Sequence, residues 1–562
     1  MKRFKSILLV LSLVLSGSLV AAPQQDQIPQ FRSQTNLVLV PVQVRNKGQH
    51  VAGLKQESFS ILQDGKEQKI SVFEEVRTTT ERLKRSPVQP NEFTNELVGT
   101  PQTARYTVIA IDRINTATLD MIRLREGLTK FLAEAADTGE PIRLVSIEYK
   151  GIRLIHDFTT DPKAIARALQ ASTNPIGRPT QNSGTLNDGL QELQVMATPD
   201  AGASEEDTAK FADFLSKLDK VKESEQQMMA FQQRTSRISS LEALQQLAIS
   251  LAGLPGRKSL VWASSGYPFT SMAREGRTSV TRDYGQVLEA TSLDQYTTQL
   301  LNSANIALYP VDARGTQNTA YQAIDPSQKY SPTAAQKEYL QTANQDVITT
   351  FEHLAASTGG KPCYERADVS GCFKDAMEDS RDYYMLGFYV DPKGVKDGWH
   401  KIQVKVSEKG TSVRARNGYL YPLPDPAKTR DQDMGTAINS LLVDAALPFR
   451  GEWLSQEPKG NKKSAHFVIN VDPNANIIDT EKNRVNIEFA GTARAKDGTV
   501  AAQFAQKIDR TLPPEAIASI KQGGINYKNN FDLAPGEYLV RFIVRDNLSG
   551  RLGGVSTILK VN

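Results

Sequence analysis

Polar side chains that could hold an ion or a ligand follow several apolar runs of this sequence. Tyr106–Ile111 is one such run, and a carboxylate, an amide and a hydroxyl come directly after it. A later loop and the end of the run Ser259–Ala263 add further hydroxyl groups. The candidate metal or ligand residues are Asp112, Asn115, Thr116, Thr185, Ser264 and Ser265. Oxygen atoms of these types suit a hard divalent cation or a hydrogen-bonding partner.

These groups can gather only if the runs before them are neighbouring strands of one sheet. Between residues 104 and 381, apolar runs alternate with helical patterns. Such alternation is typical of a doubly wound α/β domain with a mostly parallel sheet. Ligands of such sheets bind beyond the carboxyl ends of the strands. We therefore expect the candidate residues to form a recognition rim at that edge.

The order of these parts resembles a von Willebrand factor type A (VWA) domain, which is a Rossmann-like fold. In that family, a D-x-S-x-S motif after the first strand, a Thr in a second loop and an Asp after the fourth strand bind a divalent cation at a metal-ion-dependent adhesion site. Asp112 and Thr116 match two positions of the motif, and Thr185 matches the Thr. The resemblance therefore implies a binding site at this rim.

The motif is degenerate at two positions. Ile114 stands where the first Ser belongs, and Ser264 or Ser265 stands where the final Asp belongs. An apolar side chain cannot coordinate a cation, and the lost Asp removes one formal charge. No cofactor is therefore certain, and Mg²⁺ or another divalent cation stays an open alternative. Asp312 follows the strand Ile306–Val311 on the same rim, with Arg314 as its expected partner.

The resemblance extends beyond the α/β region. Further blocks of the chain are similar to acidobacterial-type secreted VWFA-related proteins. These blocks are Asn46–Val76, Leu254–Trp262, Tyr309–Gly315, Tyr384–Tyr419 and Pro535–Arg551. What this family resemblance implies is an exported binding or surface protein.

A serine hydrolase is the catalytic alternative, with Ser264 or Ser265 as the nucleophile. The five His residues are scattered singly, and no G-x-S-x-G, H-E-x-x-H or S-x-x-K motif is present. A serine nucleophile needs a general base within hydrogen-bond reach. The sequence therefore favours a protein that is not an enzyme.

The N-terminus has the three parts of a secretory signal peptide. Basic residues Lys2, Arg3 and Lys5 precede the apolar run Ile7–Val20, and small residues follow at positions 21 and 22. We expect cleavage near residue 22, a periplasmic or extracellular protein, no lipid anchor and no transmembrane helix in the mature chain. Cys363 and Cys372 are the only two cysteines, and an oxidising compartment favours a disulfide between them.

The remaining chain divides into β-rich segments and linkers. The predicted boundaries are a signal peptide at 1–22, an N-terminal β unit at 35–77, a linker at 78–103, the VWA-like domain at 104–381 with a helical insertion at 198–252 and a loop insertion at 315–345, β hairpins at 382–421, a linker at 422–435 and a C-terminal β-sandwich at 436–562. The hairpins and the N-terminal unit are expected to share one sandwich. The fold class expected is thus α/β plus all-β, with Ig-like β-sandwich units flanking the VWA domain.

The charge balance narrows the class of partner. The formal net charge is +4, and Lys2, Arg3 and Lys5 lie in the predicted signal peptide. A nearly neutral mature chain offers no broad basic field for nucleic acid. The sequence therefore predicts a non-catalytic protein that binds a protein partner or mediates adhesion. A structural scaffold of the cell envelope without a rim ligand is the alternative.

Overall fold

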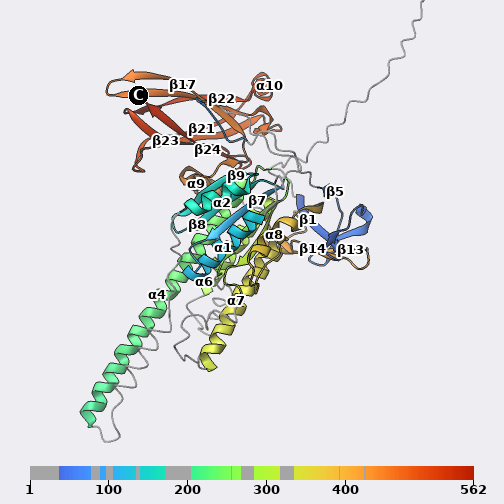
Figure 1. Cartoon of the computed structure of the whole chain (residues 1–562). Coiled ribbons are helices and arrows are strands. Elements are labelled where there is room, and N and C mark those ends of the chain that lie inside the picture. The colour runs from blue at the N-terminus through green and yellow to red at the C-terminus, as the bar shows by residue number, and fades with distance from the viewer. Residues whose placement is uncertain are drawn as a thin grey trace, which may run out of the picture. The chain divides into compact units, whose positions relative to one another are not determined.

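The computed structural model describes most of the chain after the N-terminal segment (Figure 1). The described residues are 37–77, 89–96, 105–134, 140–172, 204–254, 256–266, 284–316, 334–391, 393–422 and 426–562. The predicted signal peptide and Thr185 lie outside them. In the part that is described, we found no helix with the length and apolarity needed to cross a membrane.

One five-stranded sheet carries the candidate site. Its strands are β7 (Tyr106–Asp112), β8 (Ile142–Glu148), β9 (Gly151–Thr159), β10 (Lys258–Ser264) and β11 (Ile306–Asp312). Their order is β11-β10-β7-β8-β9, with parallel pairing except between β8 and β9. Every residue of β7, β10 and β11 is buried, as expected for apolar strands covered on both faces.

Helices cover both faces of this sheet. One face packs against α1 (Thr118–Glu134), α2 (Pro162–Ala171) and α8 (Ser370–Asp379), whose apolar side chains share a core with alternate residues of the strands. The other face packs against α4 (Glu205–Leu251), α6 (Tyr284–Ser303) and α7 (Ala334–Thr358). The second core is centred on Trp262, whose indole meets the ring of Phe351 edge to face.

Two antiparallel sheets join segments that are far apart in the sequence. The first sheet contains β1 (Leu37–Asn46), β2 (Gln49–His50), β5 (Val72–Arg77), β12 (Asp382–Tyr389) and β14 (Ser412–Ala415), with β1 between β14 and β12. The second contains β3 (Phe59–Gln63), β4 (Lys66–Gln68), β13 (Gly398–Val406) and β15 (Gly418–Tyr421), in the order β15-β13-β3-β4, and η1 (Gln56–Ser58) precedes β3. Residues from both segments share one apolar core. The two segments for which the sequence indicates a common sandwich are thus hydrogen-bonded to each other.

The C-terminal region forms two further antiparallel sheets around an aromatic core. One contains β16 (Asp444–Ala445), β19 (Ile478–Asp479), β20 (Arg484–Arg494), β21 (Val500–Thr511), β23 (Gly536–Asp546) and β24 (Leu552–Val561). The other contains β6 (Glu92–Thr94), β17 (Phe449–Lys459), β18 (Lys462–Val471) and β22 (Ile525–Leu533). The connections include η2 (Pro473–Ala475) and α10 (Pro514–Gly523). Phe467 lies at the centre of the core and contacts four other aromatic rings of the described chain.

The expected fold class, with a Rossmann-like VWA domain at its centre, is wrong. The described chain is β-rich, and four of its five sheets are antiparallel throughout. Among the strands of the described chain, parallel pairing is limited to β7, β8, β10 and β11, and even their sheet has an antiparallel edge strand. One isolated parallel bridge joins Val311 to Cys363. The expectation relied on the alternating segment between residues 104 and 381. The antiparallel strands come mainly from the parts of the chain on either side of that segment.

Three expected irregular segments also contain regular structure. Within the linker at 78–103, β6 pairs with β17 of the C-terminal sandwich. Within the predicted linker at 422–435, α9 (Pro426–Asn439) begins directly after residues 423–425, which lie outside the described chain. The loop insertion at 315–345 contains the start of α7 at Ala334. The expected helical insertion at 198–252 contains α4.

Candidate functional site

The carboxyl ends of β7 and β10 bring most of the candidate residues together. We call the group Asp112, Asn115, Thr116, Ser264 and Ser265 the rim. Its members are joined by hydrogen bonds, because parallel strands end at the same edge of a sheet. Thr185 lies outside the described residues, so its place relative to the rim stays a prediction.

Asp112 is the centre of the rim. Its side chain is completely buried, and both carboxylate oxygens accept hydrogen bonds from the protein. Oδ1 accepts hydrogen bonds from the backbone N–H groups of Ile114 and Asn115, at 3.0 and 3.1 Å. Oδ2 accepts hydrogen bonds from Asn115 Nδ2, Ser264 Oγ, Trp262 Nε1 and Ser240 Oγ, at 2.9, 3.0, 3.3 and 3.4 Å. Burial raises the pKa of this carboxyl, and the hydrogen bonds oppose that shift only in part.

This arrangement does not fit a divalent cation. A cation needs oxygen acceptors, whereas the groups around Asp112 use their hydrogens to donate to it. Ile114 is 2% exposed and packs in the apolar core instead of facing the rim's oxygen atoms. The described residues also include no cluster of three or more His, Cys, Asp or Glu side chains that could hold a metal ion.

The outer part of the rim is a second polar network. Thr116 Oγ1 accepts a hydrogen bond from the backbone N–H of Ser265 at 3.3 Å, and Ser265 Oγ donates to Asp120 Oδ2 at 2.7 Å. Burial is the main cause that raises the pKa of Asp120. Asp312 forms the expected pair with Arg314, with Nη2 and Oδ2 2.7 Å apart. The charged groups Asp120, Asp312 and Arg314 beside the rim are thus each bonded to a neighbouring side chain.

The sequence reasoning missed three residues that form hydrogen bonds with the rim. Ser240 comes from α4, Trp262 from β10 and Asp120 from the first turn of α1. An acidic residue in the first turn is favoured by the positive end of the helix dipole, so the sequence could have indicated Asp120. Ser240 gave no such signal, because its contact with Asp112 depends on how α4 packs across the sheet.

The two rim serines are not arranged as nucleophiles. Ser264 Oγ donates to Asp112 and accepts from the backbone N–H of Gly266 at 3.0 Å, while Ser265 Oγ donates to Asp120. In the described chain, no hydrogen bond or ion pair joins a histidine side chain to a rim serine. This holds for all five histidines, His50, His156, His353, His400 and His466. A histidine base for either serine is therefore not in place.

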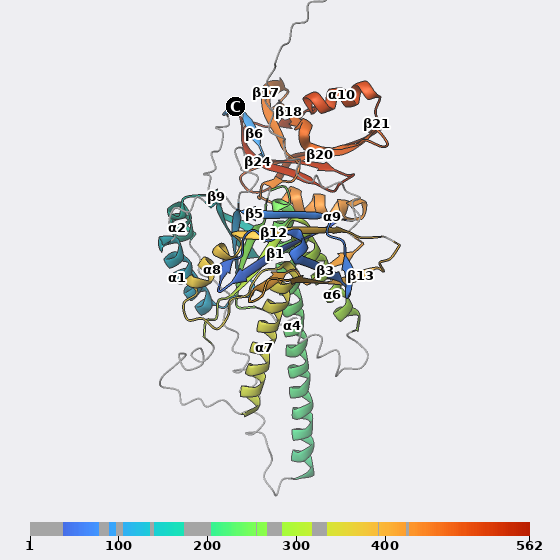
Figure 2. The ribbon, with the colours of Figure 1, turned by 90° about the vertical axis from the view of Figure 1, so that its right-hand side faces the viewer.

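Two helices project past the rim. Ser240 of α4 lies at Asp112, and α4 runs antiparallel to the strands, because its C-terminal end leads into the amino end of β10. Its residues from Glu205 to Ser240 therefore extend about 50 Å beyond the rim at 1.5 Å per residue. A Cβ added at Gly266 would lie 2.4 Å from Val347 of α7, so the N-terminal part of α7 also passes the rim. Figure 2 shows both helices leaving the same edge of the sheet.

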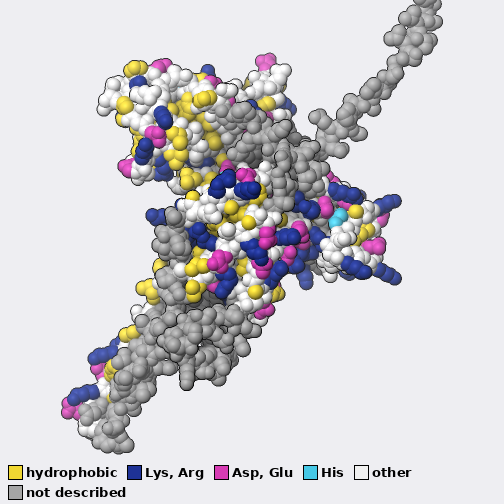
Figure 3. Space-filling view, viewed as in Figure 1, with side chains coloured by type: hydrophobic (Ala, Val, Ile, Leu, Met, Phe, Trp, Pro, Cys, Tyr) yellow, Lys and Arg dark blue, Asp and Glu magenta, His cyan; other side chains and the backbone are white. Residues whose placement is uncertain are grey.

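The projecting part of α4, which we call the arm, exposes large apolar side chains. Val221, Met228 and Phe231 are 48%, 59% and 67% exposed. Their spacings of seven and three residues place them on one side of the helix. Figure 3 shows hydrophobic side chains along the flank of this helix, between charged ones.

The two cysteines form the expected disulfide. Cys363 lies beside β11, with its backbone N–H bonded to Pro310 O at 2.8 Å, and Cys372 lies in α8. The bond therefore ties the edge of the sheet to a helix that covers it.

Comparisons with known proteins give no family for this chain. No protein-family model and no curated protein matches it. Among solved structures, it is similar to the pilus adhesin SpaC from Lactobacillus rhamnosus GG at 8% identity, with a TM-score of 0.22 and 92% of this chain covered. The match spans 59% of that adhesin's length. At such a TM-score the similarity supports no argument on fold or function, so the chain's family is not established and its role must be inferred from its own residues.

Proposed function

We propose that this chain is an exported, non-catalytic protein that binds a protein partner through the arm of α4 and the adjoining rim. The exposed apolar side chains of Val221, Met228 and Phe231 carry the proposal. Apolar side chains that recur at helical spacing are the usual anchors when a helix docks into a partner's groove. Their burial in a complex removes apolar surface from water, which favours binding.

The polar residues of the rim support binding more than catalysis. Ser264 is completely buried, and no histidine of the described chain is bonded to Ser264 or Ser265, so neither serine has the histidine base of a serine nucleophile. Rim loops and helices supported by a buried hydrogen-bond network form a rigid base for a recognition surface. The export part of the proposal rests on the signal-peptide pattern and on the disulfide, which persists in oxidising compartments.

The test replaces the three exposed apolar side chains of the arm together. The variant Val221→Gln/Met228→Gln/Phe231→Gln should keep the wild-type melting temperature, because exposed side chains stabilise the fold little. It should lose the partner that the wild type captures by cross-linking from the envelope of the source organism. Hydrogen exchange should show that the captured partner slows exchange at residues 205–236 in the wild-type chain.

A matched control changes exposed apolar residues elsewhere. Leu454→Thr/Ile558→Thr alters side chains of the C-terminal sandwich that are 50% and 62% exposed. This control should capture the partner as the wild type does. Equal capture by the arm variant would support the envelope-scaffold alternative and contradict the proposal. Labelling of Ser264 or Ser265 by a fluorophosphonate probe, abolished by Ser→Ala, would contradict the non-catalytic part.

A further inference from the structure

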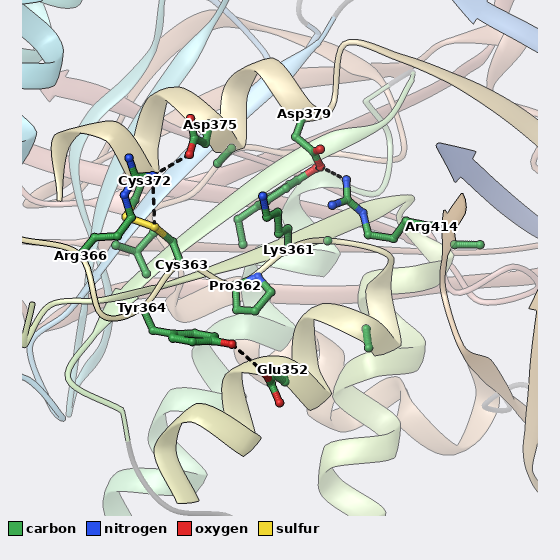
Figure 4. Close-up of a pocket in the computed structure, with 16 residues that line it drawn as sticks. Glu352, Lys361, Pro362, Cys363, Tyr364, Arg366, Cys372, Asp375, Asp379 and Arg414 are labelled. Atoms are coloured by element: carbon green, nitrogen blue, oxygen red, sulfur yellow. Dashed lines mark hydrogen bonds and ion pairs between the residues drawn. A yellow bond between two sulfur atoms is a disulfide. The ribbon is translucent and has the colours of Figure 1, made fainter. Parts of the chain in front are cut away.

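A cavity of about 560 Å³ lies along the β11 edge of the five-stranded sheet (Figure 4). It is bounded by β11, α7, α8, β14 and the segment 360–366. Its volume is within the range of pockets that hold small organic ligands. The cavity lies apart from the rim residues described above, none of which lines it.

Part of the cavity wall is apolar. Val311, Ala356, Pro362, Ala376 and Ala415 all line it, and the Cys363–Cys372 disulfide forms one side. Such a wall suits the hydrocarbon or aromatic body of a ligand. The charged groups of the cavity are therefore expected to set the orientation of what binds there.

The disulfide side of the cavity carries one cation, Arg366, and two carboxylates, Asp375 and Glu352. Arg366 Nη1 lies 2.7 Å from Asp375 Oδ2, and Figure 4 shows this pair beside the two sulfur atoms. Tyr364 donates its hydroxyl hydrogen to Glu352 at 2.8 Å. This side of the cavity offers no excess of positive charge.

The opposite side has more cations than anions. Asp379 is paired with Arg414, accepts a hydrogen bond from Tyr309 Oη at 2.9 Å, and has Arg45 Nη2 at 3.8 Å. Two guanidinium groups thus share one carboxylate. Lys361 lines the same side, between Pro362 and the Asp379–Arg414 pair in Figure 4, and has no ion pair or hydrogen bond within the described chain.

Two further cations lie behind this wall. The turn Gly359–Gly360 needs glycine, since Gly359 has a φ of +72° and a Cβ on Gly360 would lie 1.9 Å from Leu308 O. A Cβ on Gly359 would lie 3.4 Å from Arg257 Nη2 and 3.1 Å from the backbone N of Arg416. Arg257 and Arg416 are 2% and 6% exposed.

The buried guanidinium groups are incompletely satisfied. Nε of Arg257, Arg414 and Arg416 and Nη1 of Arg257 have no hydrogen-bond partner in the described part of the chain. Burial lowers the pKa of Arg416 to about 10. Asp379 interacts electrostatically with both Arg414 and Arg257, so one carboxylate opposes more than one cation. A further anion near this wall would therefore stabilise the fold.

We propose that this cavity, which we call the Lys361 pocket, binds a small organic anion. Its oxyanion, a carboxylate or a phosphate, lies between Lys361 and Arg414, and its apolar body lies against Pro362 and Ala415. Asp379 does not exclude such a ligand, because its charge is opposed by Arg414 and Arg45. The pocket is independent of the arm, so either proposal can fail without the other.

The test compares probes of similar size and different charge on the full-length chain. Benzoate and phenyl phosphate represent the carboxylate and the phosphate, and benzamide is the neutral counterpart of benzoate. Ligand-observed NMR at low ionic strength should show at least one of the two anions binding about tenfold or more tightly than benzamide. Such a ratio corresponds to about 1.4 kcal/mol. Equal binding of all three probes would overturn the proposal.

Variants then place the binding in this pocket. Lys361→Gln should weaken the bound anion about tenfold, and Lys361→Arg should retain it, because both cationic side chains can pair with an oxyanion. Lys374→Gln is the matched control, since Lys374 is an exposed lysine of α8 that does not line the cavity. Anion binding that is unchanged by Lys361→Gln, or weakened equally by Lys374→Gln, would assign the anion to another site and overturn the proposal.

Discussion

Asp112 illustrates how a carboxylate at the end of a buried strand can organise its surroundings without a metal. Its two oxygens accept hydrogen bonds from the following turn, from β10 and from α4. Each of these elements comes from a different part of the chain. The Asp112 side chain therefore joins the turn after β7, the end of β10 and α4, and this role is structural.

At the residue scale, we predict that Asp112→Asn lowers the free energy of unfolding by about 1–3 kcal/mol. The amide presents N–H groups to donors that need acceptors, and an unpaired buried polar group has a cost of this size. Urea unfolding followed by tryptophan fluorescence measures the loss, because Trp262 donates to Asp112. The control Asp397→Asn, at an exposed position, should leave the unfolding free energy within about 0.5 kcal/mol.

The same pair of proteins tests pH dependence and metal binding. The folded pKa of Asp112 is raised, so the native state holds its proton more tightly than the unfolded state. The wild type should therefore lose stability as the pH rises above the ordinary pKa of 3.8 towards the raised one, and Asp112→Asn should lack that component.

Melting temperatures should not respond to Mg²⁺, Mn²⁺ or Ca²⁺. A rise with Mg²⁺ that Asp112→Asn removes would contradict our interpretation of the rim.

Individual contacts at this scale were only partly predictable from the sequence. Asp112, Asn115, Thr116, Ser264 and Ser265 could be grouped, because each follows a strand and parallel strands end at one edge. Their partners on helices could not be found in this way. Ser240 reaches Asp112 only through the packing of α4, and residues 128 positions apart give no local signal.

At the element scale, β6 shows how a short strand can be fixed by one side chain beyond it. Asn95, which is 1% exposed, donates Nδ2 hydrogens to the carbonyls of Asp444 and Leu447 at 2.6 and 2.9 Å. Its Oδ1 accepts from the backbone N–H of Phe449 at 2.8 Å. The segment 89–96 is therefore attached to the C-terminal sandwich by side-chain bonds as well as by strand pairing.

We predict that Asn95→Ala lowers the free energy of unfolding by about 2–4 kcal/mol. The change leaves one N–H and two C=O groups without their partner in a buried place. Denaturant unfolding followed by Trp453 reports the loss, because this indole contacts Phe93 of β6. Asn91→Ala is the control, since Asn91 bonds Glu452 at an exposed site. A variant no less stable than this control would show that Asn95 does not anchor β6.

The elements that the sequence did not reveal share a physical cause. β6 has three residues, and its pairing partner β17 lies far along the chain, so neither periodicity nor a turn signal marks it. α9 lies among prolines that favoured a linker, yet proline is compatible with the first position of a helix. By contrast, α2 has an Asp161 cap, a proline at its start and an apolar stripe, which are signals of a helix that the sequence itself contains.

At the scale of the whole molecule, the sheet that contains both β1 and β12 depends on segments on either side of a long intervening region. Val38, Val40, Val42 and Val44 of β1 pack with Tyr384, Leu386 and Phe388 of β12 in one core. Alternate residues of β1 are buried on one face of the strand, but the sequence could not show which strands would cover that face. Because of this pairing, we expect the first strand and residues 382–421 to unfold together as one cooperative unit.

We therefore predict that Val42→Ala accelerates hydrogen exchange in both segments. Val42 is fully buried and faces Tyr384 on one side and Ala415 on the other, so the lost packing should cost about 2 kcal/mol. Exchange measured by mass spectrometry should quicken together at residues 37–46, 382–389 and 412–415. Val413→Ala, at a side chain 36% exposed, should change these rates little. If Val42→Ala affected residues 37–46 alone, β1 would be an independently unfolding strand, and the two segments would not form one cooperative unit.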